Sequence, residues 1–119
     1  MTVERISGEA LEKLIKGNIS EETTCVIKFY SNGCHLCHAL KKSYEEISDQ
    51  YEDVHFFAFN TEDHLNLDSI LPINGTPSIC LINTGRRKNV ITLVDPVDPD
   101  NTTWFTYTQI KNFIDKEKR

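Results

Sequence analysis

The sequence predicts an α/β domain with a small mixed sheet of four or five strands and helices on both faces. Short apolar segments of strand composition alternate with segments whose apolar residues recur at helical spacing. Strands separated by helices favour parallel pairing through right-handed crossovers, whereas a tight turn at residues 84–85 predicts one antiparallel pair. No repeat, linker or low-complexity segment interrupts the pattern, so we expect one domain over residues 1–119.

The first half of the chain is predicted to begin with a helix, a strand and a second helix. Ser7 can cap the first helix, and Gly17 suits its C-terminal end. Residues 25–30 are apolar and rich in β-formers, and turn residues at 31–33 end this predicted central strand. From residue 34 onwards apolar residues recur at spacings of three and four, which predicts an amphipathic helix.

The rest of the chain repeats this alternation and ends in a capped helix. Pro96 and Pro99 make residues 95–100 a surface loop. Thr106 and Gln109 have the spacing of a capping box at the start of the last helix. The further elements predicted are strands at 54–60, 78–83 and 89–94 and a short helix at 61–71.

Length and charge exclude several classes of protein. The chain has 119 residues, with 18 acidic and 13 basic side chains and a net charge of −5. A chain of this length buries roughly two-thirds of its unfolded surface, so the four cysteines are not needed as scaffolding. No apolar run approaches the ~18 residues of a membrane span. We therefore expect no membrane partner. Because the net negative charge repels phosphate backbones, we expect no nucleic-acid partner either.

The segment Cys34-His35-Leu36-Cys37 carries the chemistry of the predicted site. Two cysteines three residues apart at a helix start can close a small disulfide. Free backbone N–H groups and the positive end of the helix dipole stabilise a thiolate at Cys34, which makes it the expected nucleophile. Cys37, on the apolar face, is the expected resolving thiol. A protonated His35 or His38 would add positive charge beside Cys34 and favour the same thiolate.

Together these features resemble the thioredoxin superfamily, and the resemblance covers essentially the whole chain. It rests on the strand before Cys34, the cysteine pair that opens a helix, Gly75-Thr76-Pro77 before the next strand, and the capped last helix. The resemblance implies a thiol–disulfide oxidoreductase that acts on protein substrates. It also implies that Pro77 is cis and faces Cys34, with Gly33, Thr76 and Pro77 in contact with an extended substrate.

The mechanism that the resemblance implies needs no cofactor beyond the redox-active pair itself. The Cys34 thiolate attacks a substrate disulfide, a mixed disulfide forms, and Cys37 releases the product. A reductase or the glutathione system would recycle the pair, and we expect the protein to act as a monomer. Oxidase, reductase and isomerase roles stay open, because the direction depends on the redox potential and on the recycling partner.

Several residues depart from the pattern of thioredoxins. Gly33 replaces the usual aromatic residue before the first cysteine, and His35-Leu36 replace the usual Gly-Pro pair. Lys28 stands where thioredoxins carry a buried acidic residue that assists the resolving thiol. Lys28 either favours the Cys37 thiolate or points to solvent. We hypothesise that His35 and Lys28 make the pair more oxidising than the roughly −270 mV of thioredoxin.

Three other interpretations of the cysteine pair stay open. Residues 34–38 also fit C-x-x-C-H, the attachment pattern of c-type haem, although that needs export and an axial ligand. Zinc could bind Cys34, Cys37 and His38, but no fourth ligand is evident. A redox-inactive interaction module could use the groove or the acidic surface alone. Cys25 and Cys80 lie within apolar strands, and we expect them to be core residues.

The N-terminal segment bears on the compartment. Residues 1–16 mix charged and apolar side chains and lack the continuous apolar stretch of a signal peptide. We therefore expect a cytoplasmic protein, in a reducing compartment where cysteines are more often catalytic or metal-binding than structural.

Overall fold

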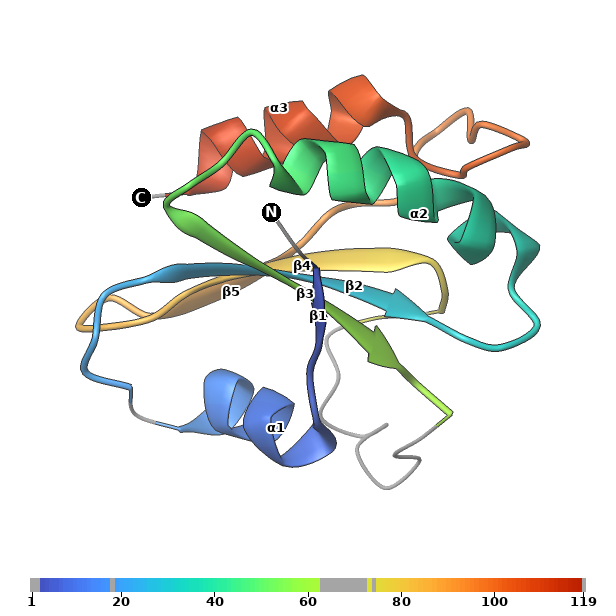
Figure 1. Cartoon of the computed structure of the whole chain (residues 1–119). Helices are drawn as coiled ribbons and strands as arrows, with labels where there is room; N and C mark the ends of the chain where they lie inside the picture. Colours follow the sequence, from blue (N-terminus) through green and yellow to red (C-terminus); the bar gives the residue numbers. More distant parts are fainter. Residues whose placement is uncertain (1–2, 18, 63–72, 74, 119) are drawn as a thin grey trace.

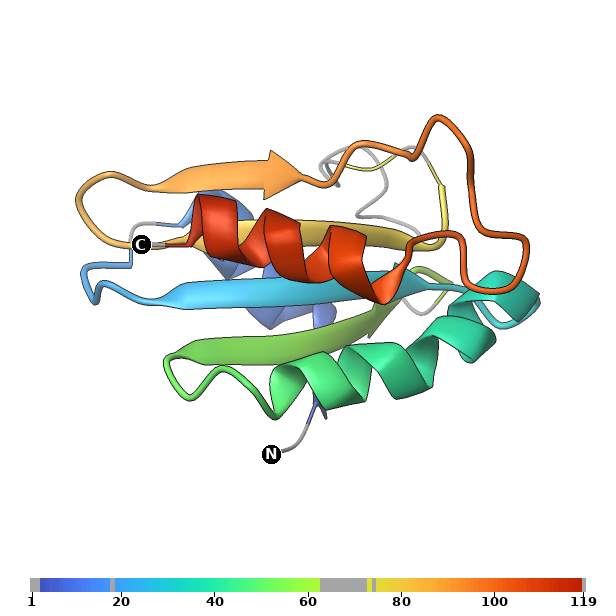
Figure 2. The same cartoon turned by 90° about the horizontal axis from the view of Figure 1, so that it is seen from above.

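A computed structural model describes residues 3–17, 19–62, 73 and 75–118. The elements in chain order are β1 (Glu4–Arg5), α1 (Gly8–Lys16), β2 (Thr24–Tyr30), α2 (His35–Ser48), β3 (Val54–Asn60), β4 (Ser78–Asn83), β5 (Asn89–Thr92) and α3 (Tyr107–Glu117). Within the described residues, α1 covers one face of a five-stranded mixed sheet, and α2 and α3 cover the other (Figures 1 and 2). This architecture confirms the predicted fold class.

The sheet has the strand order β1-β3-β2-β4-β5. Both β1 and β2 pair with β3 in parallel, whereas β4 runs antiparallel to β2 and to β5. The antiparallel pair predicted from the turn at 84–85 is confirmed as β4 and β5, whereas the parallel pairing expected for the other strands was wrong for β4 with β2. The chain leaves β3 at Asn60, beside Tyr30, and enters β4 at Ser78, beside Phe29. Because it returns to the same end of the sheet instead of crossing to the other end, β4 must run backwards.

Some predicted boundaries differ from those observed. The sequence pattern missed β1, since two exposed and charged residues carry no strand signal. The strand predicted over 89–94 ends at Thr92. Residues 61–62 of the helix predicted at 61–71 form a turn, and the rest of that segment lies outside the described residues. None of the described helices is long and apolar enough to cross a bilayer.

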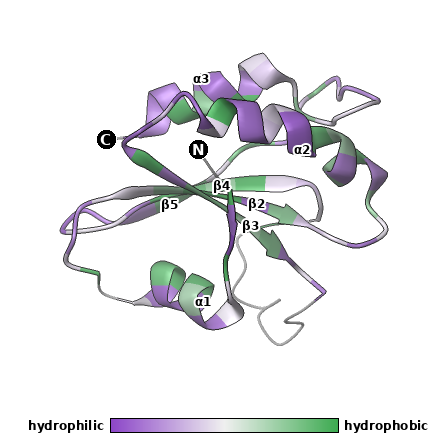
Figure 3. Cartoon of the chain, in the orientation of Figure 1, coloured by the Kyte–Doolittle hydropathy of each residue, from purple (hydrophilic) through white to green (hydrophobic). Residues whose placement is uncertain are grey.

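Strand β2 is buried on both faces and separates two apolar clusters. Val26 packs under α2 and α3, whereas Ile27 and Phe29 pack on the α1 side. Hydrophobic stretches of β2, β3 and β4 accordingly lie between the helices (Figure 3). Because side chains alternate along a strand, Lys28 shares the face of Val26 and lies beneath α2.

The two cysteines outside the predicted site are core residues, as expected. Cys25 and Cys80 are free thiols with exposed fractions of 4% and 1%. Burial disfavours their thiolates, which raises the pKa of Cys25 to about 11 and that of Cys80 to about 12. Thiols with such pKa values stay protonated at neutral pH and are poor nucleophiles.

Tyr44 joins α2 to the sheet through hydrogen bonds to the backbone of β2 and β3. Its ring is fully buried, and the backbone carbonyls of Val26, at 3.0 Å, and Phe57, at 2.7 Å, share the one proton that its hydroxyl donates. The hydroxyl thus supplies a partner for carbonyl groups of two neighbouring strands beneath the helix that the cysteine pair opens.

Removing this hydroxyl should destabilise the fold. We expect Tyr44→Phe to lower the free energy of unfolding by about 1–3 kcal/mol, because both carbonyls lose a buried donor. The control is Tyr107→Phe, which removes a hydroxyl that bonds Gln50 at the exposed surface and should change stability little. Urea unfolding of the oxidised proteins measures both effects, and equal losses would contradict this role of Tyr44.

Candidate active site

The cysteine pair lies at the start of α2, where the site residues predicted from the sequence converge. Cys34 is the N-cap residue, with extended backbone, and is partly exposed, whereas Cys37 is 1% exposed. The two form a disulfide, with their Cα atoms 5.2 Å apart. The backbone N–H of Cys37 donates to Cys34 Sγ at 3.1 Å. Of the two sulfur atoms, only that of Cys34 therefore belongs to a residue that an incoming molecule can reach readily.

The loop before Cys34 is held by polar groups at the end of β3. The Asn60 amide donates to Asn32 Oδ1 at 2.8 Å, and the backbone N–H of Asn32 donates to the Glu62 carboxylate. The backbone N–H of Glu62 in turn donates to Asn60 Oδ1 at 3.0 Å. His38 Nε2 lies 3.2 Å from the carbonyl of Asn32. These contacts fix the loop that presents Cys34.

Sequence reasoning missed this polar network. Its members are separated by about thirty residues, and nothing local to either segment pairs them. One indication of this network was present in the sequence. Asn60 is a polar residue at the end of an apolar strand, and residues 61–62, which follow it, are polar as well.

A second tether joins the loop to the segment before β4. Ser31 Oγ lies 3.0 Å from Thr76 Oγ1, within hydrogen-bond distance. The Thr76–Pro77 peptide bond is cis, and Pro77 is buried while Thr76 is partly exposed. Gly33 is exposed, and a Cβ added there would meet nothing within 4 Å. The residues expected to contact a substrate thus lie on segments that meet at this end of the sheet.

Lys28 points under α2 rather than to solvent. Its exposed fraction is only 6%. Its ammonium lies 5.6 Å from the ring centroid of Tyr30 and 5.4 Å from that of Tyr44, which are cation–π distances. Lys28 and Cys37 line the same cavity of about 300 Å³. The sequence left open whether Lys28 lies near Cys37 or points to solvent. In the structure it lies on the side of Cys37.

The environment of Lys28 disfavours its charged form. Burial is the main cause and lowers its pKa from 10.5 to about 8. The positive charge of Lys41 lowers this pKa as well, and the carboxylate of Glu45 opposes both effects. The amine therefore changes its protonation state within reach of neutral pH.

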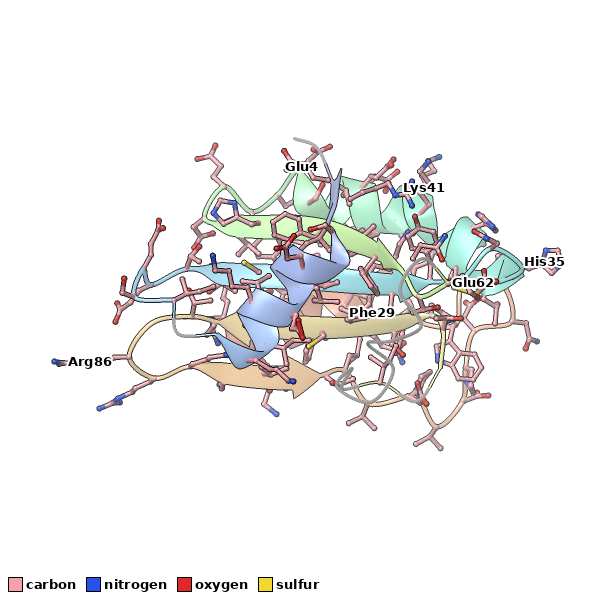
Figure 4. All side chains as sticks on the ribbon, turned by 90° about the horizontal axis from the view of Figure 1, so that it is seen from below. Glu4, Phe29, His35, Lys41, Glu62 and Arg86 are labelled. Carbon is pink, nitrogen blue, oxygen red and sulfur yellow. A yellow bond between two sulfur atoms is a disulfide. The ribbon has the colours of Figure 1, made fainter. Side chains whose placement is uncertain are left out.

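The two histidines beside the pair are both exposed. His35 projects from the end of the molecule opposite Arg86 (Figure 4). His38, one turn from Cys34, has its imidazole against the carbonyl of Asn32. The alternative of a zinc site at Cys34, Cys37 and His38 gains no support, because the described residues contain no group of three His, Cys, Asp or Glu side chains that could hold a metal ion.

The loop between β5 and α3 forms one rim of this end of the sheet. Both views place it beside the N-terminus of α2 (Figures 1 and 2). The Trp104 indole donates to Asp95 at 3.2 Å, and Trp104 itself has a positive φ of 69°. Val94 and Val97 project into solvent, with the first 82% exposed. An incoming protein would meet an acidic loop with apolar side chains at this rim.

Comparison with known proteins agrees with this fold. The sequence model named Thioredoxin matches residues 3–101. A thioredoxin from Peptoclostridium acidaminophilum is 32% identical over 78 residues, which span 65% of this chain and 71% of that protein. Chloroplastic thioredoxin z has a similar structure, with a TM-score of 0.72 at 23% identity, and covers 98% of this chain and 94% of its own. A thioredoxin from Nicotiana alata has a TM-score of 0.73 at 13% identity, covering 98% and 92%. The chain therefore belongs to the thioredoxin family.

Proposed function

We propose that this protein exchanges disulfides with protein substrates, with Cys34 as the attacking thiol and Cys37 as the resolving thiol. Family membership and the cysteine pair support a thiol–disulfide oxidoreductase in general. The observation that carries the finer assignment is the difference in exposure. Cys34 caps α2 at the surface, whereas Cys37 is buried one turn further along.

The proposed reaction has two exchange steps. The Cys34 thiolate forms a bond with one sulfur of a substrate disulfide, and the second substrate sulfur leaves as a thiolate. Cys37 Sγ then bonds to Cys34 Sγ, and the remaining substrate thiol departs. The substrate gains two electrons, and the cysteine pair becomes the disulfide observed here. A reductase or glutathione returns these electrons to the pair.

Gly33, Thr76 and Pro77 are the proposed substrate contacts. The space around Gly33 leaves the approach to Cys34 open. The hydrogen bond between Ser31 and Thr76 keeps the loop that carries the nucleophile next to the segment proposed to pair with an extended substrate. Substrate would then lie across both segments while Cys34 reacts.

A disulfide-reduction assay tests the proposal. With insulin as substrate and dithiothreitol as electron donor, we expect Cys34→Ser to lose at least 99% of the activity of the wild type, because no other exposed thiol is available among the described residues. Cys25→Ala is the matched control and should keep the activity, since that thiol is buried and protonated. Equal activity in wild type and Cys34→Ser would contradict the assignment of Cys34. No activity in either would favour the redox-inactive interaction module.

We also propose that positive charge raises the redox potential of the pair. Ammonium and imidazolium groups stabilise thiolates and so favour the reduced form. Equilibration with glutathione buffers at pH 7 should give a potential above the roughly −270 mV of thioredoxin, and His35→Ala should lower it. His55→Ala, an exposed histidine at the start of β3, is the control. A wild-type potential at or below that of thioredoxin would reject this proposal.

A further inference from the structure

We propose that Lys28 accepts the proton of the Cys37 thiol and thereby activates this thiol for the resolving step. The inference rests on the proposed function, since it concerns the second of its two exchange steps. It assigns Lys28 a positioning and proton-holding role next to Cys37, which is distinct from the attack by Cys34.

Cys37 is almost completely buried. Its exposed fraction of 1% leaves its thiol little contact with bulk water. A thiol attacks a disulfide as the thiolate, so its proton must first go to a nearby acceptor. The cavity of about 300 Å³ under α2 is lined by both Cys37 and Lys28, which makes the amine an acceptor on the same side of the helix.

The amine of Lys28 shares its cavity with charged groups of both signs. The cavity that Lys28 shares with Cys37 is also lined by Glu45, Lys41 and His38 of α2 and by Arg5 of β1. The rings of Tyr30 and Tyr44 lie within cation–π distance of the ammonium. Glu45 is the one carboxylate in this lining, and it lies on an exposed position of the helix. None of the described carboxylates forms an ion pair with Lys28 within 4.0 Å.

These surroundings keep part of the amine neutral. With a pKa of about 8, about a tenth of Lys28 is unprotonated at pH 7, and this fraction rises steeply towards pH 8. A neutral amine can accept a proton, whereas an ordinary exposed lysine is almost fully protonated at this pH. Once Lys28 is protonated, the Cys37 thiolate is a second anion, besides the Glu45 carboxylate, that can stabilise the buried cation.

The proton of Cys37 moves to Lys28 Nζ, and the electron pair left on Cys37 Sγ forms the bond to Cys34 Sγ. The bond between Cys34 Sγ and the substrate sulfur breaks, and its electron pair leaves on that sulfur. The departing thiolate takes up a proton from Lys28, either directly or through a water molecule that Lys28 then reprotonates, and this restores the neutral amine.

The resolving step can be measured alone. Reduced protein is treated with 5,5′-dithiobis(2-nitrobenzoate) in a rapid-mixing experiment, and the release of the second thionitrobenzoate at 412 nm reports the attack of Cys37 on the mixed disulfide. We expect Lys28→Met to slow this release at least tenfold at pH 7. The deficit should shrink only above about pH 8, because most of Lys28 is then already neutral whereas deprotonation of Cys37 by hydroxide keeps increasing. Lys42→Met, at an exposed position of α2 outside the cavity, removes the same charge and should release at the wild-type rate.

The variant Lys28→Arg distinguishes transfer of the Cys37 proton from electrostatic attraction between a positive charge and the Cys37 thiolate. The guanidinium keeps the positive charge but does not accept a proton at these pH values. We therefore expect Lys28→Arg to be slow at pH 7 like Lys28→Met, and release at the wild-type rate in either variant would overturn the proposal. Circular dichroism and thermal unfolding of the oxidised proteins show whether each variant is folded. A wild-type protein that bound the reagent without releasing the second thionitrobenzoate would instead contradict the proposed function itself.

Discussion

The structure depends on the double burial of β2. This strand pairs with β3 on one edge and β4 on the other, and its two faces contact separate apolar clusters. Because both edges of β2 are paired and both of its faces are packed, the position and direction of the strand are fixed. The loop that follows β2 therefore leaves the sheet at a defined point. The cysteine pair is attached directly to that loop. The position of the site is therefore a consequence of the apolar residues of β2, several residues away from the cysteine pair.

Features that depend on local pattern could be predicted from the sequence. The apolar run of β2 and the helical spacing from residue 34 place the cysteine pair at a strand-to-helix junction without any knowledge of the partner strands. Thr106 and Gln109 form the capping box that their spacing indicated. Cys25 and Cys80 were separable from the reactive pair because their neighbours are apolar, and burial is what makes their thiols inert.

Features that depend on contacts between distant segments could not be predicted. The direction of β4 follows from where the chain returns to the sheet, which no local propensity encodes. The contacts of Asn32 with Asn60 and Glu62 join segments about thirty residues apart, and Ser31 meets Thr76 across a longer separation still. The placement of Lys28 belongs to the same class. The alternation of side chains along β2 shows that Lys28 lies on the same face as Val26. It does not show which helix packs on that face.

The cost of burying Lys28 argues that the amine has a use. Its pKa in the folded protein lies below its ordinary value, so the folded state disfavours the cation. The penalty is complete below pH 8, falls as the pH rises towards 10.5, and amounts to about 3 kcal/mol at neutral pH. An apolar side chain at this position would avoid the penalty and could pack against Tyr44. Reduction of the pair changes the balance, because a Cys37 thiolate would give the buried ammonium an anionic partner. The same residue that weakens the oxidised fold would then stabilise the reduced one, and this shifts the pair towards a more oxidising potential.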